Sequence, residues 1–123
     1  MNFKSSYSLE KRKELSNKIF TKYKDKIPII IQSKNIKCKK IKFLIHKHDE
    51  FSFFFLILRK FIEIQPDDAL FTFINDTIPV NSESIGSIYK KYKDEDGFLY
   101  VNISLESTFG FSKFKWDYIN TKY

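Results

Sequence analysis

The stretch "KIPIIIQSKNIKCKKIKFLIHK" (residues 26–47) decides the fold of this chain. Its β-branched run from Ile27 to Ile31, around Pro28, predicts a strand, and "IKFLIHK" (residues 41–47) predicts a second. The polar segment "KNIKCKK" between them is typical of a loop, so the two strands are expected to form a hairpin. At 123 residues the chain has room for this hairpin in one domain with a core of its own.

The segment after the hairpin, "FSFFFLILRKFI" (residues 51–62), fits a buried strand or a buried helix by periodicity alone. Its twelve residues, and Gln65-Pro66 just beyond, favour a helix. Before the hairpin, Ser8 is a suitable cap for a helix over residues 9–24.

The rest of the chain adds two strands and one short helix. "ALFTFIND" (residues 69–76) and "FLYVNIS" (residues 98–104) are typical of strands, and Ser82 or Ser84 is expected to cap a helix that ends at Tyr92. The order predicts an α+β fold, a ubiquitin-like β-grasp with a four-stranded mixed sheet and an N-terminal helical extension.

The charge of the chain is uneven. Its net charge is +7, and residues 1–50 hold 14 lysines and arginines against 5 acids. A basic first half suggests an acidic partner such as membrane headgroups, acidic peptides or nucleic acid, and a solvated lysine-rich surface is the alternative. The polar start and the short apolar run from Phe53 to Leu58 predict no signal peptide and no membrane span, which needs about 20 residues. We therefore expect a cytoplasmic protein.

Catalytic and metal-binding patterns are weak. His46 and His48 alternate at a strand end with only Asp49 and Glu50 nearby, so we expect an exposed strand end and no metal site. Cys38 lies in a lysine-rich loop, a setting that can lower a thiol pKa, but no partner base can be named, so we expect no role for it. The chain has no glycine-rich phosphate loop and no nucleophile elbow, so we expect no enzymatic activity. "DGFLYVNI" (residues 96–103) matches an RNA-recognition strand too poorly to predict nucleic-acid binding.

One glycine is unusually placed. Only three glycines occur, and Gly110 lies between Phe109 and Phe111, after the last expected strand and before a 13-residue tail. A glycine there is either a turn or a position that needs a residue without a Cβ for another reason.

Several segments follow one another in a familiar order. They are "FKSSYSLEKRK", "DKIPIII", "KIKFLI", "LRKFIEIQPDDALFTFINDTIP" and "IYKKYKDEDGFLYVNISLESTFG". They closely resemble the ubiquitin-like autophagy modifiers, the family of the GABA-receptor-associated protein, over residues 3–110. "YKDEDGFLYV" and "ESTFG" are the most specific of these motifs, and the tail from Phe111 lies outside the resemblance.

The resemblance implies a modifier that becomes attached to a lipid. A cysteine protease would cut between Gly110 and Phe111, and activating and conjugating enzymes would then carry the glycine carboxylate as thioesters. The amine of phosphatidylethanolamine on the autophagosome membrane would accept it, with no other cofactor. An extended tail that threads narrow active sites suits a last residue without a Cβ, which makes Gly110 an ending rather than a turn.

Further expectations follow from the resemblance. The chain would be cytoplasmic, and on the autophagosome membrane when lipidated. Its parts would be a helical extension (residues 1–24), a ubiquitin-like domain (residues 25–110) and a propeptide (residues 111–123). A contact with the protease is implied at Phe71 and Phe73.

The resemblance also implies docking of cargo receptors through peptides with an aromatic-x-x-aliphatic pattern. The peptide would add as a strand to the edge of the second strand, with its two anchors in two pockets. The first pocket would be lined by Ile19, Pro28, Ile30, Lys42, Leu44 and Phe98. The second would include Phe43, Ile45, Phe54 and Ile57. Lys26 and Lys42 would attract acidic residues that flank the peptide motif.

Four positions depart from the family pattern. Asp49 replaces a usual leucine and Phe61 a usual arginine, while Leu15 replaces a glutamate and His46 a proline. The loop between the first two strands is also shorter than usual. The first pocket is therefore expected to be intact, and the second to be altered in shape and charge.

The tail "FSKFKWDYINTKY" (residues 111–123) itself carries the aromatic-x-x-aliphatic pattern at Trp116–Ile119. One hypothesis is that the uncut tail occupies the peptide groove of its own molecule or of a neighbour, and a disordered propeptide is the alternative. Two functions stay open for the whole chain. It is either a lipid-conjugated modifier and adaptor, or an unconjugated basic ubiquitin-like module that binds RNA or membrane surfaces.

Overall fold

The computed structural model describes residues 2–33 and 36–105. The predictions for Gly110, for Phe111 and for the motif at Trp116–Ile119 lie outside the described residues.

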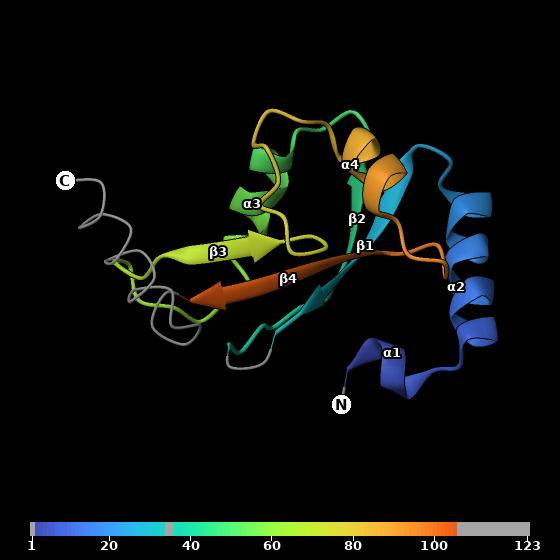
Figure 1. The fold of residues 1–123 in the computed structure, drawn as a ribbon, viewed down its shortest axis with the longest axis horizontal. Coiled ribbons are helices and arrows are strands. Elements are labelled where there is room, and N and C mark those ends of the chain that lie inside the picture. The colour runs from blue at the N-terminus through green and yellow to red at the C-terminus, as the bar shows by residue number, and fades with distance from the viewer. Residues whose placement is uncertain (1, 34–35, 106–123) are drawn as a thin grey trace.

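Four strands form one mixed sheet with the order β2-β1-β4-β3, in which β1 and β4 are parallel and the other pairs antiparallel. The elements in chain order are α1 (Phe3–Ser6), α2 (Leu9–Lys22), β1 (Lys26–Gln32), β2 (Lys42–His46), α3 (Phe51–Arg59), β3 (Leu70–Phe73), α4 (Ile85–Tyr92) and β4 (Leu99–Leu105). Helices α3 and α4 lie above the sheet in Figure 1, and α1 lies below it. The predicted fold class, including the hairpin of β1 and β2, is confirmed.

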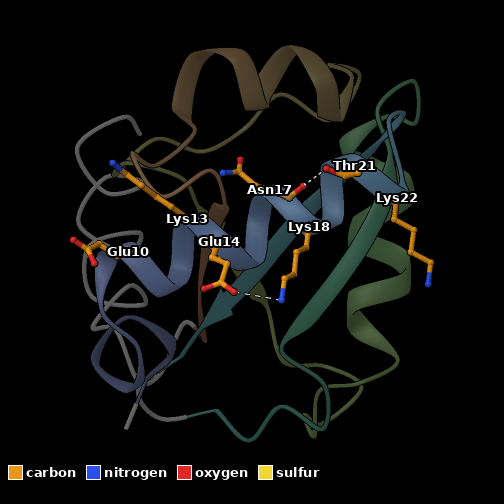
Figure 2. A pocket seen from close by; sticks show the side chains of 7 residues that line it. All are labelled: Glu10, Lys13, Glu14, Asn17, Lys18, Thr21 and Lys22. Carbon is orange, nitrogen blue, oxygen red and sulfur yellow. Dashed lines mark hydrogen bonds and ion pairs between the residues drawn. The ribbon is translucent and has the colours of Figure 1, made fainter.

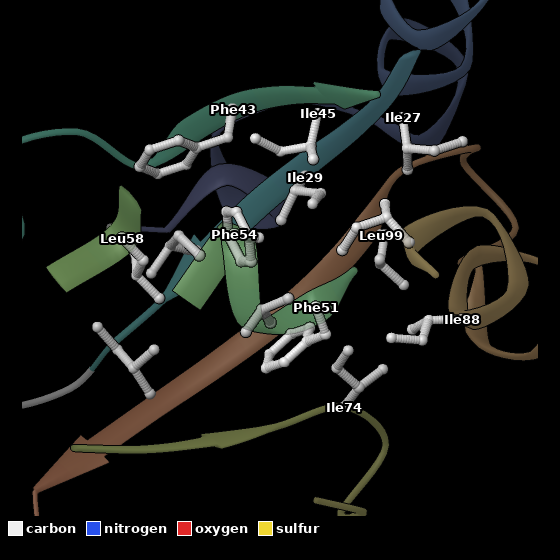
Figure 3. Packing of buried hydrophobic residues seen from close by; sticks show 14 of the residues in the cluster. Ile27, Ile29, Phe43, Ile45, Phe51, Phe54, Leu58, Ile74, Ile88 and Leu99 are labelled. Carbon is white, nitrogen blue, oxygen red and sulfur yellow. The ribbon is translucent and has the colours of Figure 1, made fainter. Parts of the chain in front are cut away.

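The ambiguous segment after the hairpin is a helix. Phe51, Phe54 and Leu58 follow one another at helical spacing on one face of α3 and are almost completely buried. Figure 3 shows them packed against the side of the sheet that carries Ile29 and Leu99, which we call the front face. This packing makes the main core of the molecule.

The back face of the sheet is covered in part by α1 and α2. Along β1 the side chains alternate, so Ile27, Ile29 and Ile31 enter the main core while Ile30 joins a second, smaller cluster. The members of that second cluster are Phe3, Ile30, Phe98 and Tyr100, with Leu15 and Ile19 packed against it. Helix α2 begins at the predicted cap, because the Ser8 side chain accepts a hydrogen bond from the Lys11 amide at 3.1 Å.

The N-terminal extension contains two helices, because α1, which was not predicted from the sequence, precedes α2. Asn2 caps this short helix by accepting a hydrogen bond from the Ser5 amide at 2.9 Å. Four residues cannot form a stable helix alone, so α1 depends on burial of Phe3, which is 6% exposed.

Candidate functional site

A hollow of about 520 Å³ lies on the back face, between the N-terminal helices and the hairpin. It brings together all six residues predicted for the first pocket, namely Ile19, Pro28, Ile30, Lys42, Leu44 and Phe98. The other residues that line it are Phe3, Leu15, Lys18, Ile29, Lys40 and Phe43. The six residues predicted for the first pocket therefore lie close together in the structure. Their role in peptide binding stays a prediction.

The hollow has an apolar floor and a partly charged rim. Ile30 and Phe98 are 2% and 3% exposed and form the floor, whereas Leu44 is 36% exposed at the rim. The ammonium group of Lys42 lies 5.5 Å from the ring centroid of Phe3, and the Lys40 ammonium lies 5.0 Å from that of Phe43. An apolar floor below cationic groups suits an aromatic side chain that has acidic neighbours.

Phe3 also lines the hollow, although it was not predicted from the sequence. Its ring meets the Phe98 ring edge to face, with centroids 5.1 Å apart. The available signal was an aromatic residue directly after a capping residue, Asn2. Helix α1 therefore supplies one wall of the hollow.

Within residues 2–33 and 36–105, no strand pairs with the outer edge of the sheet next to this hollow. β2 is the outermost strand in the sheet order, and β1 pairs with it on one side, with Pro28 opposite Leu44 and Ile29 opposite Phe43. Along β2, Lys42 and Leu44 line the hollow on the back face, while Phe43 enters the main core on the front face. We call the hollow together with the outer edge of β2 the β2 groove.

The residues predicted for the second pocket lie on the front face and are tightly packed. Phe43, Ile45 and Phe54 are 4%, 6% and 0% exposed, and Ile57 packs against the same core. The ring of Phe61 lies edge to face with that of Phe43, at 5.6 Å between centroids. Phe61, one of the four departures from the family pattern, therefore fills space beside β2. Binding of a peptide side chain at this position would require the surrounding side chains to move.

Some predicted contact residues lie away from the groove. Lys26 is exposed at the start of β1, with its ammonium 5.4 Å from the Tyr23 ring centroid, and it does not line the hollow. Phe71 and Phe73 are half-buried on β3, the strand at the other edge of the sheet. Their predicted roles remain predictions.

The candidate metal and thiol residues have ordinary surroundings. The rings of His46 and His48 lie 5.2 Å apart, and in residues 2–33 and 36–105 no three potential metal ligands gather around one point. The lysine-rich loop does not lower the pKa of Cys38, because partial burial of the thiol raises this pKa. Its thiol donates a hydrogen bond to the Lys40 carbonyl at 2.9 Å. Burial outweighs the hydrogen bond at the Lys40 backbone, which acts in the opposite direction.

A larger hollow of about 640 Å³ runs along the solvent side of α2 (Figure 2). All its lining residues come from this one helix, and they are Glu10, Lys13, Glu14, Asn17, Lys18, Thr21 and Lys22. The side chains are polar and point outward, with Lys18 paired to Glu14 at 3.3 Å. A surface formed by a single helix, with no opposite wall, does not make a binding site.

A buried carboxylate holds α2 in place over the back face. Asp96 is 1% exposed, and its side chain accepts hydrogen bonds from the Arg12 guanidinium at 2.6 Å and from the Tyr100 hydroxyl. It also accepts one from the Phe98 amide at 2.9 Å, while the Ser16 hydroxyl donates to the Asp96 carbonyl at 2.6 Å. Two residues of α2 are thus bound to the turn that carries Phe98, which positions the walls of the hollow.

The family model for "Autophagy protein Atg8 ubiquitin like" matches residues 11–110 of this sequence. The chain is 40% identical over 112 residues to Autophagy-related protein 8 of Saccharomyces cerevisiae, an alignment that spans 88% of this chain and 96% of that protein.

This chain belongs to the Atg8 family.

Other Atg8 proteins agree with this assignment. The protein of Candida glabrata is 39% identical over 114 residues, covering 89% of this chain and 97% of its own length. The crystal structure of Trypanosoma brucei ATG8 superposes with a TM-score of 0.75 at 34% identity, over 86% of this chain and 95% of that one. Plasmodium falciparum Atg8, solved in complex with an Atg3 peptide, superposes with a TM-score of 0.76 at 27% identity, over 85% and 95% of the two chains.

This Atg8-family chain is thus a ubiquitin-like autophagy protein. Each helix in its described part is too short or too polar to cross a bilayer.

Replacing Asp96 is expected to loosen the α2 attachment of this Atg8-family protein. Asp96→Ala leaves the Arg12 guanidinium and the Tyr100 hydroxyl without their buried partner, so the free energy of unfolding should fall by about 3–5 kcal/mol. Urea unfolding followed by circular dichroism measures this change. Glu95→Ala, an exposed neighbour, is the matched control and should change stability by less than about 0.5 kcal/mol. Equal losses in the two variants would contradict a special role of Asp96.

The same cluster predicts sensitivity to alkali. Burial, and then the neighbouring Asp96 carboxylate, raise the pKa of Tyr100 above its ordinary value of 10.0. The folded state therefore favours the protonated phenol, and this contribution is complete below pH 10 and is lost as the pH rises further. Stability measured between pH 9 and about pH 11 should fall less steeply in Tyr100→Phe than in the wild type. Burial also raises the Tyr89 pKa, which leaves part of the slope in the variant. Identical slopes would contradict the assignment.

Proposed function

We propose that this chain is a lipid-conjugated modifier of autophagy that docks short peptides of cargo receptors in the β2 groove. The observation that carries the docking function is an apolar hollow directly beside the open edge of β2. Peptides with an exposed backbone add readily to such an edge, because the strand offers them a row of hydrogen-bonding groups.

The two faces of β2 account for the spacing of the two anchors. Side chains of an added strand alternate between the two faces of the sheet, so residues i and i+3 point to opposite faces. An aromatic residue at i would enter the back hollow over Ile30 and Phe98, and an aliphatic residue at i+3 would meet Phe43 and Ile45 on the front. The tight packing around Phe61 makes the front anchor the weaker one.

Rim lysines would select peptides with acidic residues beside the motif. Lys18, Lys40 and Lys42 line the hollow, and in the described part of the chain no acidic side chain lines it. Attraction between exposed charges raises the association rate and fades as salt screens it.

Charge reversal at the rim should weaken docking. The probe is a fluorescein-labelled peptide in which two glutamates precede the sequence Trp-Thr-Thr-Leu, and its anisotropy reports binding. Lys42→Glu should raise the Kd by about tenfold or more at low salt, because it replaces attraction by repulsion beside the aromatic anchor. Lys13→Glu is the matched control on the solvent side of α2 and should change the Kd by less than about twofold. If Lys13→Glu weakens binding as much, the groove is not the docking site.

The conjugation function depends on Gly110. Hydrolysis of the bond between Gly110 and Phe111 would free a carboxylate. An activating enzyme would join this carboxylate to a cysteine thiol as a thioester, with ATP consumed to remove the oxygen. The amine of phosphatidylethanolamine would then displace the thiol and form an amide. The chain would be the substrate of these steps and not their catalyst. The Atg3 peptide bound to Plasmodium falciparum Atg8 supports a conjugating enzyme as a partner of this chain. The lipid would move the protein from the cytoplasm to the autophagosome membrane.

The intact mass of the protein from its own cells tests conjugation. In the membrane fraction we expect a species that ends at Gly110 and carries one phosphatidylethanolamine. Gly110→Ala should remove most of this species, because a Cβ obstructs passage through narrow active sites, while Ser112→Ala should not. A chain that keeps residues 111–123 in both fractions would contradict conjugation and favour the unconjugated binding module.

A further inference from the structure

We propose that Trp116–Ile119 of this chain occupy the β2 groove of their own molecule until the segment after Gly110 is removed. This inference rests on the docking function proposed above, and it identifies the first occupant of the groove. The uncut protein would then be closed to cargo peptides.

The sequence of the tail is suited to an added strand. Phe114, Trp116 and Tyr118 alternate with Lys113, Lys115 and Asp117. An extended backbone places the three aromatic rings on one face and the charged groups on the other. Such a strand needs both an edge to pair with and an apolar surface for its rings, and the β2 groove offers both.

The register follows from the two faces of β2. With Trp116 in the back hollow over Ile30 and Phe98, Ile119 faces the front beside Phe43. Tyr118 returns to the back face, where Leu44 is the exposed apolar side chain of β2. The tail therefore supplies one residue for each anchor position.

The tail is long enough to reach the groove of the same molecule. Phe98 precedes β4 and Leu105 ends it, so the hollow lies about 23 Å back along the strand from the point where the tail begins. The outer edge of β2 is about three strand spacings, or about 14 Å, across the sheet, which gives a direct distance of about 27 Å. The eleven residues from Leu105 to Trp116 span up to about 36 Å.

The direction of the returning chain also fits. β4 is parallel to β1 and β1 is antiparallel to β2, so β4 and β2 run in opposite directions. A tail that reverses after β4 therefore runs parallel to β2 and meets Lys42 before Leu44.

Charge distinguishes this occupant from an acidic peptide. Lys113 and Lys115 approach a groove whose rim carries Lys18, Lys40 and Lys42. Burial of aromatic rings would hold the tail against this repulsion, so its docking should be weak enough for displacement by an acidic peptide and should strengthen with salt.

The test compares the full-length wild type with the full-length double variant Trp116→Ala, Ile119→Ala. Tyr123→Ala is the matched control, since it removes an aromatic ring from the same tail outside the motif. The first measurement is the amide NMR spectrum at Ile30, Lys42 and Leu44. The second is the Kd of the acidic Trp-Thr-Thr-Leu probe described above.

In the double variant the amide signals of the groove should move, and the probe should bind about tenfold tighter or more, because a tethered competitor has an effective concentration near the millimolar range. The Tyr123→Ala protein should match the wild type. The ratio of the probe Kd of the wild type to that of the double variant should increase between about 0.05 and 0.3 M salt, because screening removes the lysine repulsion that weakens docking of the tail.

Three results would overturn the inference. Unchanged groove signals in the double variant would exclude the tail as occupant. Equal probe affinities for wild type and double variant would also exclude the tail as occupant, but would not contradict the proposed docking of external peptides. A dimer that dissociates in the double variant would assign the tail to the groove of a neighbouring copy. If no protein binds the probe but the groove signals still move, the tail assignment holds and the proposed docking of external peptides fails.

Discussion

The buried Asp96 carboxylate is the constraint on which the back face of this molecule depends. A carboxylate without water is very unfavourable unless donors surround it, and here Arg12, Tyr100 and the Phe98 amide do so. Because Arg12 belongs to α2 and Phe98 to the turn before β4, satisfying the charge fixes the distance between these elements. The helix that walls the hollow is thus held by a polar contact beneath it.

Close backbone packing at the same turn reinforces this constraint. Gly97 has a φ of +92°, and a Cβ at this position would come within 2.4 Å of the Ser16 Oγ of α2. Lys4 of α1 adds an ion pair of 2.7 Å to Asp94 of the same turn. Both N-terminal helices therefore attach to one turn, and the hollow lies between them and the hairpin.

The helices cover the two faces of the sheet to different extents, and this difference explains why the back face carries a groove. On the front, α3 packs large apolar residues such as Phe51 and Phe54 against the sheet, where they are almost completely buried. On the back, two helices cover the sheet only in part, so the apolar side chains of Ile30 and Phe98 form a floor under a hollow. An aromatic group from a strand added at β2 would complete the burial of this floor.

Local patterns in the sequence were sufficient to predict the hairpin and α3. The six residues around the hollow were predicted by resemblance to a known family. α1 was missed because its stability comes from Phe3 against Phe98, a contact across the whole chain that no local pattern contains. The burial of Asp96 could not be predicted from "KDEDG" (residues 93–97), since its partner Arg12 lies 84 positions away. The raised pKa of Cys38 could not be predicted for the same reason, because burial is not visible in a lysine-rich sequence.

The most direct test of this account is to determine which side chains surround the aromatic anchor of a bound peptide. An isotope-filtered NOE experiment on the protein with the Trp-Thr-Thr-Leu probe reports which side chains lie near the indole ring. The account predicts NOEs from the indole to the methyl groups of Ile30 and Leu44 and to the ring of Phe98. NOEs to Asn17 and Thr21 on the solvent side of α2 instead, or to Phe53 and Leu56 on α3, would contradict it.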